Sequence, residues 1–315
     1  MSIDKMDRRD FLSKIGLSGL ALSIGGAACG GGGAGAGAPA PSLSAAGQGA
    51  AAMRKGPKVA LCTIAFQDRP LDEVLKLAAD VGFDGVEPWG KPDHLPLTRT
   101  DDEVKAIQER IAGLGLKTSH YGSYVRLGDG QDPAEKDRDM QRSVDITRLL
   151  DTDICRIWAG LKNSELLNEA DWKLMVEDGK RFCARAEQAG VLLAIEMHGN
   201  SVTNKASAAV DLINRVGSPS LKLNYQILGE SEDPYERARL AGSHVVMVHA
   251  QNENPSGRGQ SLICEGAVDF RKVWEILHGQ FGFAGYFEVE FVRGNTMDEK
   301  VAALKADYEC LRGIA

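Results

Sequence analysis

Two residues with metal-binding or acid–base side chains, Glu196 and His198, close an apolar run in the segment Val191–Asn200. The apolar run predicts a strand that is buried on both faces, as in a parallel sheet. Because side chains alternate along a strand, the carboxylate and the imidazole would share one face at its carboxyl end. Such a pair can bind a divalent metal or transfer protons. The alternative is a strand end that only meets solvent.

The segments that position these residues alternate between strand and helix patterns from Lys58 onward. Strands are predicted at Lys58–Ala65, Phe83–Glu87, Leu116–Tyr121, Ile154–Trp158, Val191–Met197, Leu221–Tyr225, His244–His249 and Phe283–Glu290. Helices are predicted at Leu71–Val81, Asp101–Gly113, Ala134–Leu150, Glu169–Ala189, Lys205–Val216, Pro234–Ala241, Phe270–Phe281 and Met297–Leu311. Eight strand–helix units favour an α/β fold with a single (β/α)8 TIM barrel over a doubly wound sheet.

Polar side chains gather at the carboxyl ends of the predicted strands, which form the active face of such a barrel. The set comprises Glu87, His120, Trp158, Glu196, His198, Gln226, His249 and Glu290. Each residue also has a simpler interpretation, as a solvated loop start or a partner for a loop hydrogen bond. Glu290 shares a strand face with Glu288, and two carboxylates near a barrel axis need a cation or protons. Glu196, His249 and Glu290 offer oxygen and nitrogen ligands that suit Mn²⁺, Mg²⁺ or Co²⁺, and zinc is also compatible.

Six short motifs occur along the barrel segment in a characteristic order. They are GFDGVE at Gly82–Glu87, EMHGN at Glu196–Asn200, LKLNYQ at Leu221–Gln226, VVMVHAQN at Val245–Asn252, EGAVDF at Glu265–Phe270 and GYFEVE at Gly285–Glu290. Their order and spacing resemble the sugar phosphate isomerase/epimerase superfamily, the xylose-isomerase-like TIM barrels. The resemblance covers Lys58–Leu311 and implies one divalent metal held by Glu196, His249 and Glu290. Gln226 stands where the family has a metal-binding Asp, so we expect it to be the fourth ligand, binding through its neutral amide oxygen.

The same resemblance implies a reaction on a small carbohydrate or keto-sugar. Family members abstract a proton next to a carbonyl and form an enediolate, and Glu196 and Glu290 are the expected catalytic residues. Expected substrate contacts are Glu87, His120, Trp158, His198 and, in the loop after the seventh strand, Arg258. A metal-dependent lyase reaction, β-elimination from a 3-keto-glycoside, uses the same enolate. The sequence leaves isomerisation and elimination both open.

Two other classes of function compete with an enzyme of this kind. A non-catalytic sugar-binding lipoprotein on the same barrel would explain the neutral Gln226, whereas the presence of both Glu196 and Glu290 argues against it. Some apurinic endonucleases share the barrel, but their three zinc ions need more His and Asp ligands than this chain offers. The chain also has a net charge of −7 and contains no Lys/Arg-rich block, which disfavours a nucleic-acid partner.

The N-terminal part of the chain has the composition of an export signal followed by a tether. Arg8 and Arg9 precede the apolar run Ile15–Ala28, which resembles a twin-arginine signal, although the pair could be a chance occurrence. Cys29 ends a sequence similar to a lipobox, in which Gly26 is unusual, so both lipidation and cleavage without a lipid stay open. We therefore predict a signal peptide at 1–29, a Gly/Ala/Pro-rich linker at 30–56 and the barrel at 57–315.

These features predict an exported protein that is periplasmic or lipid-anchored at the cell envelope. A lipid at Cys29 would be its contact with the membrane, and the oligomeric state is left open. With Cys29 set apart, an odd number of cysteines remains: Cys62, Cys155, Cys183, Cys264 and Cys310. This count argues against a full disulfide framework, and we expect most of them to be small core residues.

Overall fold

A computed structural model describes residues 56–227, 232–256 and 259–314. The predicted signal peptide with Cys29, the predicted linker up to residue 55, and Arg258 lie outside the described residues. The expectations for these segments are therefore not addressed by the fold.

The strands form one parallel sheet that closes on itself. Its segments are β1 Lys58–Cys62, β2 Gly85–Glu87, β3 Lys117–Thr118, β4 Tyr121–Leu127, β5 Ile154–Ala159, β6 Leu192–Glu196, β7 Leu221–Gln226, β8 Val245–Ala250 and β11 Tyr286–Val289. The first strand pairs with the last, β1 with β11. Only Ser119 and His120 separate β3 from β4, so these two segments act as one strand. A parallel bridge between Trp89 and Gly122 closes the remaining seam.

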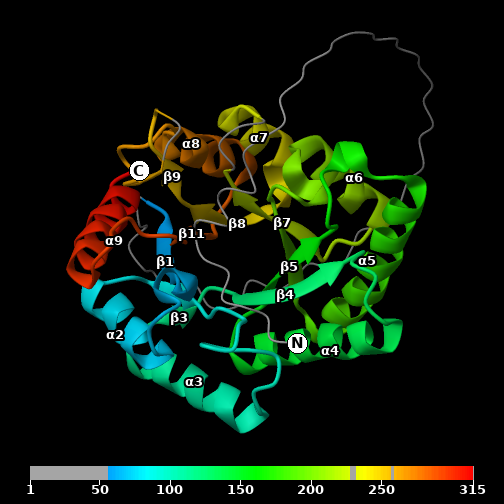
Figure 1. Ribbon diagram of the computed structural model, residues 1–315, viewed down its shortest axis with the longest axis horizontal. Helices are drawn as coiled ribbons and strands as arrows, with labels where there is room; N and C mark the ends of the chain where they lie inside the picture. Colours follow the sequence, from blue (N-terminus) through cyan, green and yellow to red (C-terminus); the bar gives the residue numbers. More distant parts are fainter. Residues whose placement is uncertain (1–55, 228–231, 257–258, 315) are drawn as a thin grey trace. The chain divides into compact units, whose positions relative to one another are not determined.

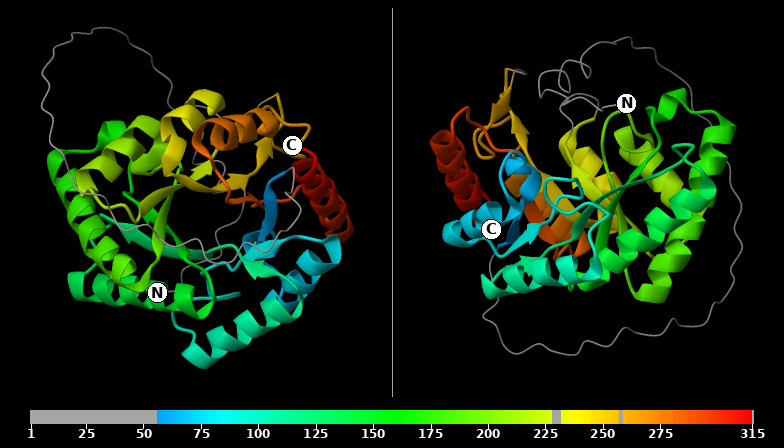
Figure 2. Two further views of the ribbon diagram at one scale, coloured as in Figure 1. Left: turned by 180° about the vertical axis from the view of Figure 1, so that it is seen from behind. Right: turned by 60° about the horizontal axis from the view of Figure 1, so that its bottom comes forward.

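Eight helices surround these strands, as Figure 1 shows. They are α2 Leu71–Val81, α3 Asp101–Gly113, α4 Pro133–Leu149, α5 Glu169–Ala189, α6 Ala206–Val216, α7 Pro234–Ala241, α8 Phe270–Phe281 and α9 Met297–Arg312. Figure 2 shows from behind that the red helix α9 lies beside the blue strand β1, where the two ends of the barrel meet. The predicted (β/α)8 barrel is confirmed. Within the described ranges, no helix combines the length and apolarity that crossing a bilayer requires.

The two faces of the strands have different chemistry. Apolar side chains such as Leu193, Ile195 and Phe287 belong to the buried cluster that joins the strands to the helices. The alternating positions carry polar groups, and Arg156 and Glu288 are buried although both can be charged. TIM barrels usually fill their interior with branched apolar side chains. The polar interior of this barrel therefore marks the part of the fold where binding or catalysis can take place.

The third strand differs most from its prediction, which ended it at Tyr121. The chain breaks at Ser119–His120 and then continues as β4 to Leu127. The break turns the His120 side chain into the barrel, where it contacts a carboxylate of β11. A glycine is needed at position 122, because a Cβ there would lie 2.3 Å from Glu87 Oε1 and would clash with it.

Two smaller predictions are also corrected. The first strand ends at Cys62, since Thr63–Phe66 forms a 3₁₀ turn whose Thr63 hydroxyl accepts a hydrogen bond from the Trp89 backbone N–H. The loop after β8 contains a short antiparallel pair, β9 Asn252–Glu253 and β10 Gln260–Ser261, that the polar sequence did not indicate.

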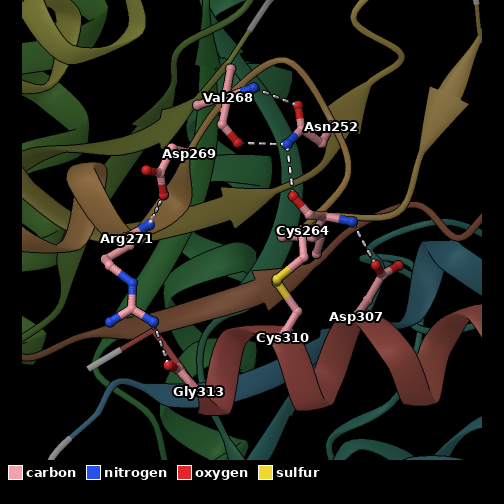
Figure 3. Close-up of a disulfide and its surroundings, with 9 residues drawn as sticks. Asn252, Cys264, Val268, Asp269, Arg271, Asp307, Cys310 and Gly313 are labelled. Atoms are coloured by element: carbon pink, nitrogen blue, oxygen red, sulfur yellow. Dashed lines mark hydrogen bonds between the residues drawn. A yellow bond between two sulfur atoms is a disulfide. The ribbon is translucent and has the colours of Figure 1, made fainter.

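A disulfide joins the loop after β10 to helix α9 (Figure 3). It links Cys264 to Cys310 across 46 residues. The Asn252 side chain organises the same loop, because its amide donates hydrogen bonds to the backbone oxygens of Ile263 and Val268. Elsewhere in the described chain, Cys62, Cys155 and Cys183 are free and buried, as expected of small core residues. The sequence count did not indicate this single bridge.

Candidate metal centre and active site

The carboxyl ends of β6, β8 and the segment after β11 bring three of the predicted metal ligands together. Glu196, His249 and Glu290 each offer one ligand atom, and these atoms lie within 4.8 Å of one another. All three residues are buried, with at most 5% of the residue surface exposed. Gln226 ends β7 beside His249, and its Nε2 donates a hydrogen bond to Glu290 Oε2 at 3.1 Å. The four residues that the sequence singled out as ligands therefore form one cluster.

The chemistry of this cluster fits a divalent cation. Glu196 Oε2, Gln226 Oε1 and His249 Nδ1 are buried and lack a hydrogen bond of good geometry among the described residues. Glu196 Oε2 and His249 Nδ1 have ion-pair contacts, with Arg156 at 3.1 Å and Glu290 at 3.3 Å, whereas Gln226 Oε1 has neither. Leaving a buried polar atom unsatisfied costs about 1–3 kcal/mol. One cation can satisfy all three atoms, and two carboxylates, an amide oxygen and an imidazole suit Mg²⁺, Mn²⁺ or Co²⁺.

Glu87 fixes the orientation of His249. His249 Nε2 lies 3.0 Å from Glu87 Oε2, whereas Nδ1 lies 3.3 Å from Glu290 Oε1. A carboxylate that holds one ring N–H sets the tautomer of a ligating histidine and points its other nitrogen at the metal. Burial lowers the pKa of His249, but Glu290 and Glu87 outweigh burial and raise it well above its ordinary value.

Glu87, His120 and Glu288 extend the contacts of His249 into an alternating row of carboxylates and imidazoles. His120 Nε2 lies 3.0 Å from Glu87 Oε1, and His120 Nδ1 lies 3.0 Å from Glu288 Oε1. Burial opposes a charge on His120, yet Glu288 and Glu87 raise the pKa of its imidazole. Glu87, His120 and Glu288 are completely buried. Direct contact of Glu87 and His120 with substrate stays a prediction, and their burial favours a positioning role.

Arg156 is a site residue that the sequence analysis missed. It lies on β5 with 2% exposure, and its Nη1 is 3.1 Å from Glu196 Oε2. Its Nη2 is 3.3 Å from Glu87 Oε1. Burial raises the pKa of Glu196, and Arg156 opposes this shift. The sequence did contain evidence for this role. Arg156 lies two residues before Trp158 in an apolar strand, so both side chains must lie on the same face of that strand.

Aromatic side chains line the site next to Arg156. The Trp158 ring stacks on Tyr124 with 5.9 Å between centroids and packs against His198 at 5.1 Å. Trp89 Nε1 donates a hydrogen bond to the Tyr124 hydroxyl at 2.6 Å. The structure thus brings the predicted contacts Trp158 and His198 together beside the metal cluster. Such rings offer the apolar surface on which a sugar can pack.

Known relatives of this chain include a dehydratase and an epimerase. The chain is 22% identical over 177 residues to a 3-dehydroshikimate dehydratase of Bacillus anthracis, a match that covers 54% of this chain and 62% of the relative. It is 22% identical over 253 residues to a fructoselysine 3-epimerase of Shigella flexneri, covering 75% of this chain and 90% of the relative.

The fold has solved counterparts, and a family profile matches most of the barrel. A xylose isomerase-like TIM barrel protein from Mycobacterium smegmatis in complex with magnesium superimposes with a TM-score of 0.65 at 18% identity, covering 82% of this chain and 98% of that protein. The family profile described as xylose isomerase-like TIM barrel matches residues 75–314. The chain therefore belongs to the xylose isomerase-like TIM barrel family.

Proposed function

We propose that this chain is an exported, divalent-metal-dependent isomerase or epimerase that moves a proton next to the carbonyl of a small carbohydrate or keto-sugar. The observation that carries this proposal is the buried cluster of Glu196, His249 and Glu290, next to the unpartnered Gln226 Oε1. The epimerase among the relatives supports it.

The residues of the cluster would have different roles in such a reaction. Glu196 and Glu290 would remove and return the proton at the carbon next to the carbonyl. Arg156 holds Glu196 in place through the contact at 3.1 Å. A divalent ion held by Glu196, Gln226, His249 and Glu290 would supply the positive charge that stabilises an enediolate. The Trp158 and His198 rings would orient the sugar.

A metal-dependent elimination is the second candidate. The dehydratase among the relatives favours it. Glu196 or Glu290 would remove the proton, as in the first candidate reaction. The resulting enolate would then expel a substituent from the neighbouring carbon. A neutral 3-keto-glycoside, or a keto-sugar with a leaving hydroxyl, would undergo such a reaction.

Metal analysis and deuterium exchange test both candidates. The purified full-length chain should bind Mn²⁺ or Mg²⁺, and with a substrate in D₂O it should place deuterium on the carbon next to the carbonyl. An epimerised product identifies the isomerase, whereas release of water or of a glycosidic group identifies the lyase. Sugar binding without deuterium exchange would instead support a non-catalytic binding protein.

Substitutions test the residues. Glu196→Ala, His249→Ala and Glu290→Ala should each lower bound metal and abolish turnover. Glu275→Gln, on the exposed surface of α8, is the matched control and should leave both unchanged. Full metal occupancy in all three alanine variants would show that the ligands lie elsewhere.

A further inference from the structure

A group of cations lies on the β4–β5 side of the active site, next to the metal cluster. Lys91 Nζ lies 3.9 Å from the centroid of the Tyr124 ring. Arg126 Cζ lies 4.8 Å from the centroid of the Trp158 ring. Arg156 Cζ lies 4.7 Å from the Tyr124 centroid and 5.5 Å from the Trp158 centroid. Three positive charges thus surround one stacked aromatic pair.

Among the described residues, only Arg156 of these three cations makes a direct ion pair with a carboxylate. Arg156 has Glu87 and Glu196 as ion-pair partners. In the part of the chain that the structure describes, no carboxylate oxygen lies within 4.0 Å of Lys91 or Arg126. Arg126 makes its hydrogen bond to a neutral acceptor, the Gly160 backbone oxygen, at 2.7 Å. Neither Lys91 nor Arg126 therefore has a direct ion-pair partner among the described residues, although Asp129 and Glu196 act on Arg126 from a longer distance.

The surroundings of Lys91 and Arg126 make these charges costly. Both side chains are partly buried, and burial lowers the pKa of each. Arg156 and Arg126 lower the pKa of Lys91 further. At Arg126, Asp129 and Glu196 oppose the effect of burial, whereas Arg156 adds to it. A bound anion would reduce the repulsion between these like charges.

An unused donor completes the group. The indole Nε1 of Trp158 is buried and has no hydrogen-bond partner among the described residues. Its ring contacts His198, and Arg156 joins the same aromatic pair to Glu196. A ligand group bound here would therefore lie close to the carboxylate that is proposed to move the proton.

We propose that the substrate carries an anionic group, a carboxylate or a phosphate, which Lys91, Arg126 and the Trp158 indole N–H bind while its carbonyl lies at the metal cluster. This inference rests on the proposed function and narrows its substrate class from carbohydrates in general to sugar acids or sugar phosphates. Charged hydrogen bonds of this kind distinguish an anionic substrate from a neutral one of the same size.

Calorimetric titration of the full-length chain with Mn²⁺ present tests the proposal. The probes are D-glucuronate, D-glucose 6-phosphate and neutral D-glucose. We expect one anion to bind at least about tenfold more tightly than D-glucose, with an affinity that falls as salt is added. Preference for glucuronate identifies a carboxylate site, and preference for the phosphate identifies a phosphate site. Equal binding of all three probes would overturn the proposal.

Two variants and two matched controls locate the anion. Lys91→Met and Arg126→Gln should each weaken binding of the preferred anion by about 10- to 100-fold and leave D-glucose binding unchanged. Lys305→Met and Arg148→Gln remove exposed charges from α9 and α4, and they should have no effect. Unchanged anion affinity in both site variants would overturn the proposal.

The Mn²⁺ content of each variant separates this inference from the proposed function. Lys91 and Arg126 are not metal ligands, so both variants should hold as much metal as the wild-type chain. Absence of metal or of deuterium exchange in the wild-type chain would count against the proposed function. Anion preference is measured by binding alone, so its outcome stays decisive in that case.

Discussion

Gln226 lowers the negative charge of the candidate metal centre by one relative to a site with a carboxylate at this position. Its Nε2 donates to Glu290 Oε2 at 3.1 Å, and its Oε1 is buried with no partner in the described chain. An amide oxygen binds a cation more weakly than a carboxylate does. It also leaves the cation more electropositive, which strengthens its effect on a carbonyl.

We therefore predict opposite effects for two substitutions at this position. Gln226→Asp should tighten Mn²⁺ binding by about tenfold, since it adds a charge beside the cation. The same change should lower the melting temperature in EDTA, because the new carboxylate would face Glu290. Gln226→Leu should weaken Mn²⁺ binding and turnover. Calorimetric titration and thermal melts measure both effects, and wild-type affinity and activity in the leucine variant would contradict the prediction.

We expect Glu87 to support metal binding by orienting His249. It holds His249 Nε2 at 3.0 Å and thereby points Nδ1 toward the other ligands. We predict that Glu87→Gln lowers Mn²⁺ affinity by about 10- to 100-fold, the range seen when such a supporting carboxylate is lost. Metal titration of this variant beside Glu275→Gln measures the effect. An unchanged affinity would mean that His249 does not depend on Glu87 for its orientation.

The sequence singled out the candidate metal ligands and Glu87, but not Arg156 or the contacts that join these residues. Glu196, His249 and Glu290 could be found because each ends a strand at the active face of the barrel. Arg156 and Glu87 come from different strands, β5 and β2, and their contact at 3.3 Å depends on how these strands are placed across the barrel. The alternation of side chains along a strand predicts which face of the sheet a residue lies on. Which residue it contacts across the barrel depends on how the sheet closes, and the sequence pattern does not predict this.

Among the elements, helices were predicted more accurately than strands. Helix α3 begins after a Thr100–Glu103 capping box, and α2 ends at Gly82 with φ of 100°. Such signals lie within the chain segment itself. Strand ends instead depend on a partner, and β11 begins at Tyr286 although the apolar pattern starts at Phe283. Gly285 marks this entry, because a Cβ there would lie 2.1 Å from the Val246 backbone oxygen.

The disulfide should stabilise the loop after β10 and helix α9. Closing 46 residues between Cys264 and Cys310 removes unfolded-state entropy worth about 4 kcal/mol. We predict that the Cys264→Ser/Cys310→Ser double variant melts several degrees below the oxidised wild-type chain. Dithiothreitol should lower the melting temperature of the wild-type chain to a similar value and leave the double variant unchanged. Identical melting of the oxidised and reduced wild-type chain would contradict this prediction.

Asp307 on α9 gives the same region a pH dependence. It accepts a hydrogen bond from the Ile263 backbone N–H at 2.7 Å, and burial raises its pKa to about 7. The folded chain therefore binds a proton that the unfolded chain has lost above about pH 4. Stability from this group is present at low pH and is lost as the pH rises through about 7.

Asp307→Asn should remove this dependence. Asparagine keeps an oxygen for the Ile263 N–H but does not ionise. Urea unfolding at pH 5 and pH 8 should show that the wild-type chain loses on the order of 2 kcal/mol more stability than the variant over this interval. A parallel pH dependence in both chains would show that Asp307 does not contribute to it.

At the scale of the whole molecule, the proposed export rests on the N-terminal sequence and is compatible with a disulfide in the barrel. Arg8 and Arg9 lead into an apolar run, and the barrel contains a disulfide between Cys264 and Cys310. Structural disulfides form and persist mainly in oxidising compartments outside the cytoplasm. The proposed export would therefore place the chain where the Cys264–Cys310 bridge can persist.

Lipidation and export at the N-terminus can be tested together with the redox state of the barrel. Replacing Arg8 and Arg9 by Lys should trap the unprocessed chain in the cytoplasm, because a twin-arginine signal does not tolerate loss of its arginine pair. In that compartment Cys264 and Cys310 should stay reduced and react with a thiol-alkylating reagent, whereas the exported chain should not be labelled at these positions. Mass spectrometry of both cell fractions measures processing and labelling at once. Labelled fatty acid should be found on the exported chain and be absent after Cys29→Ser. Unchanged export and oxidation of the lysine variant would show that Arg8 and Arg9 do not direct export.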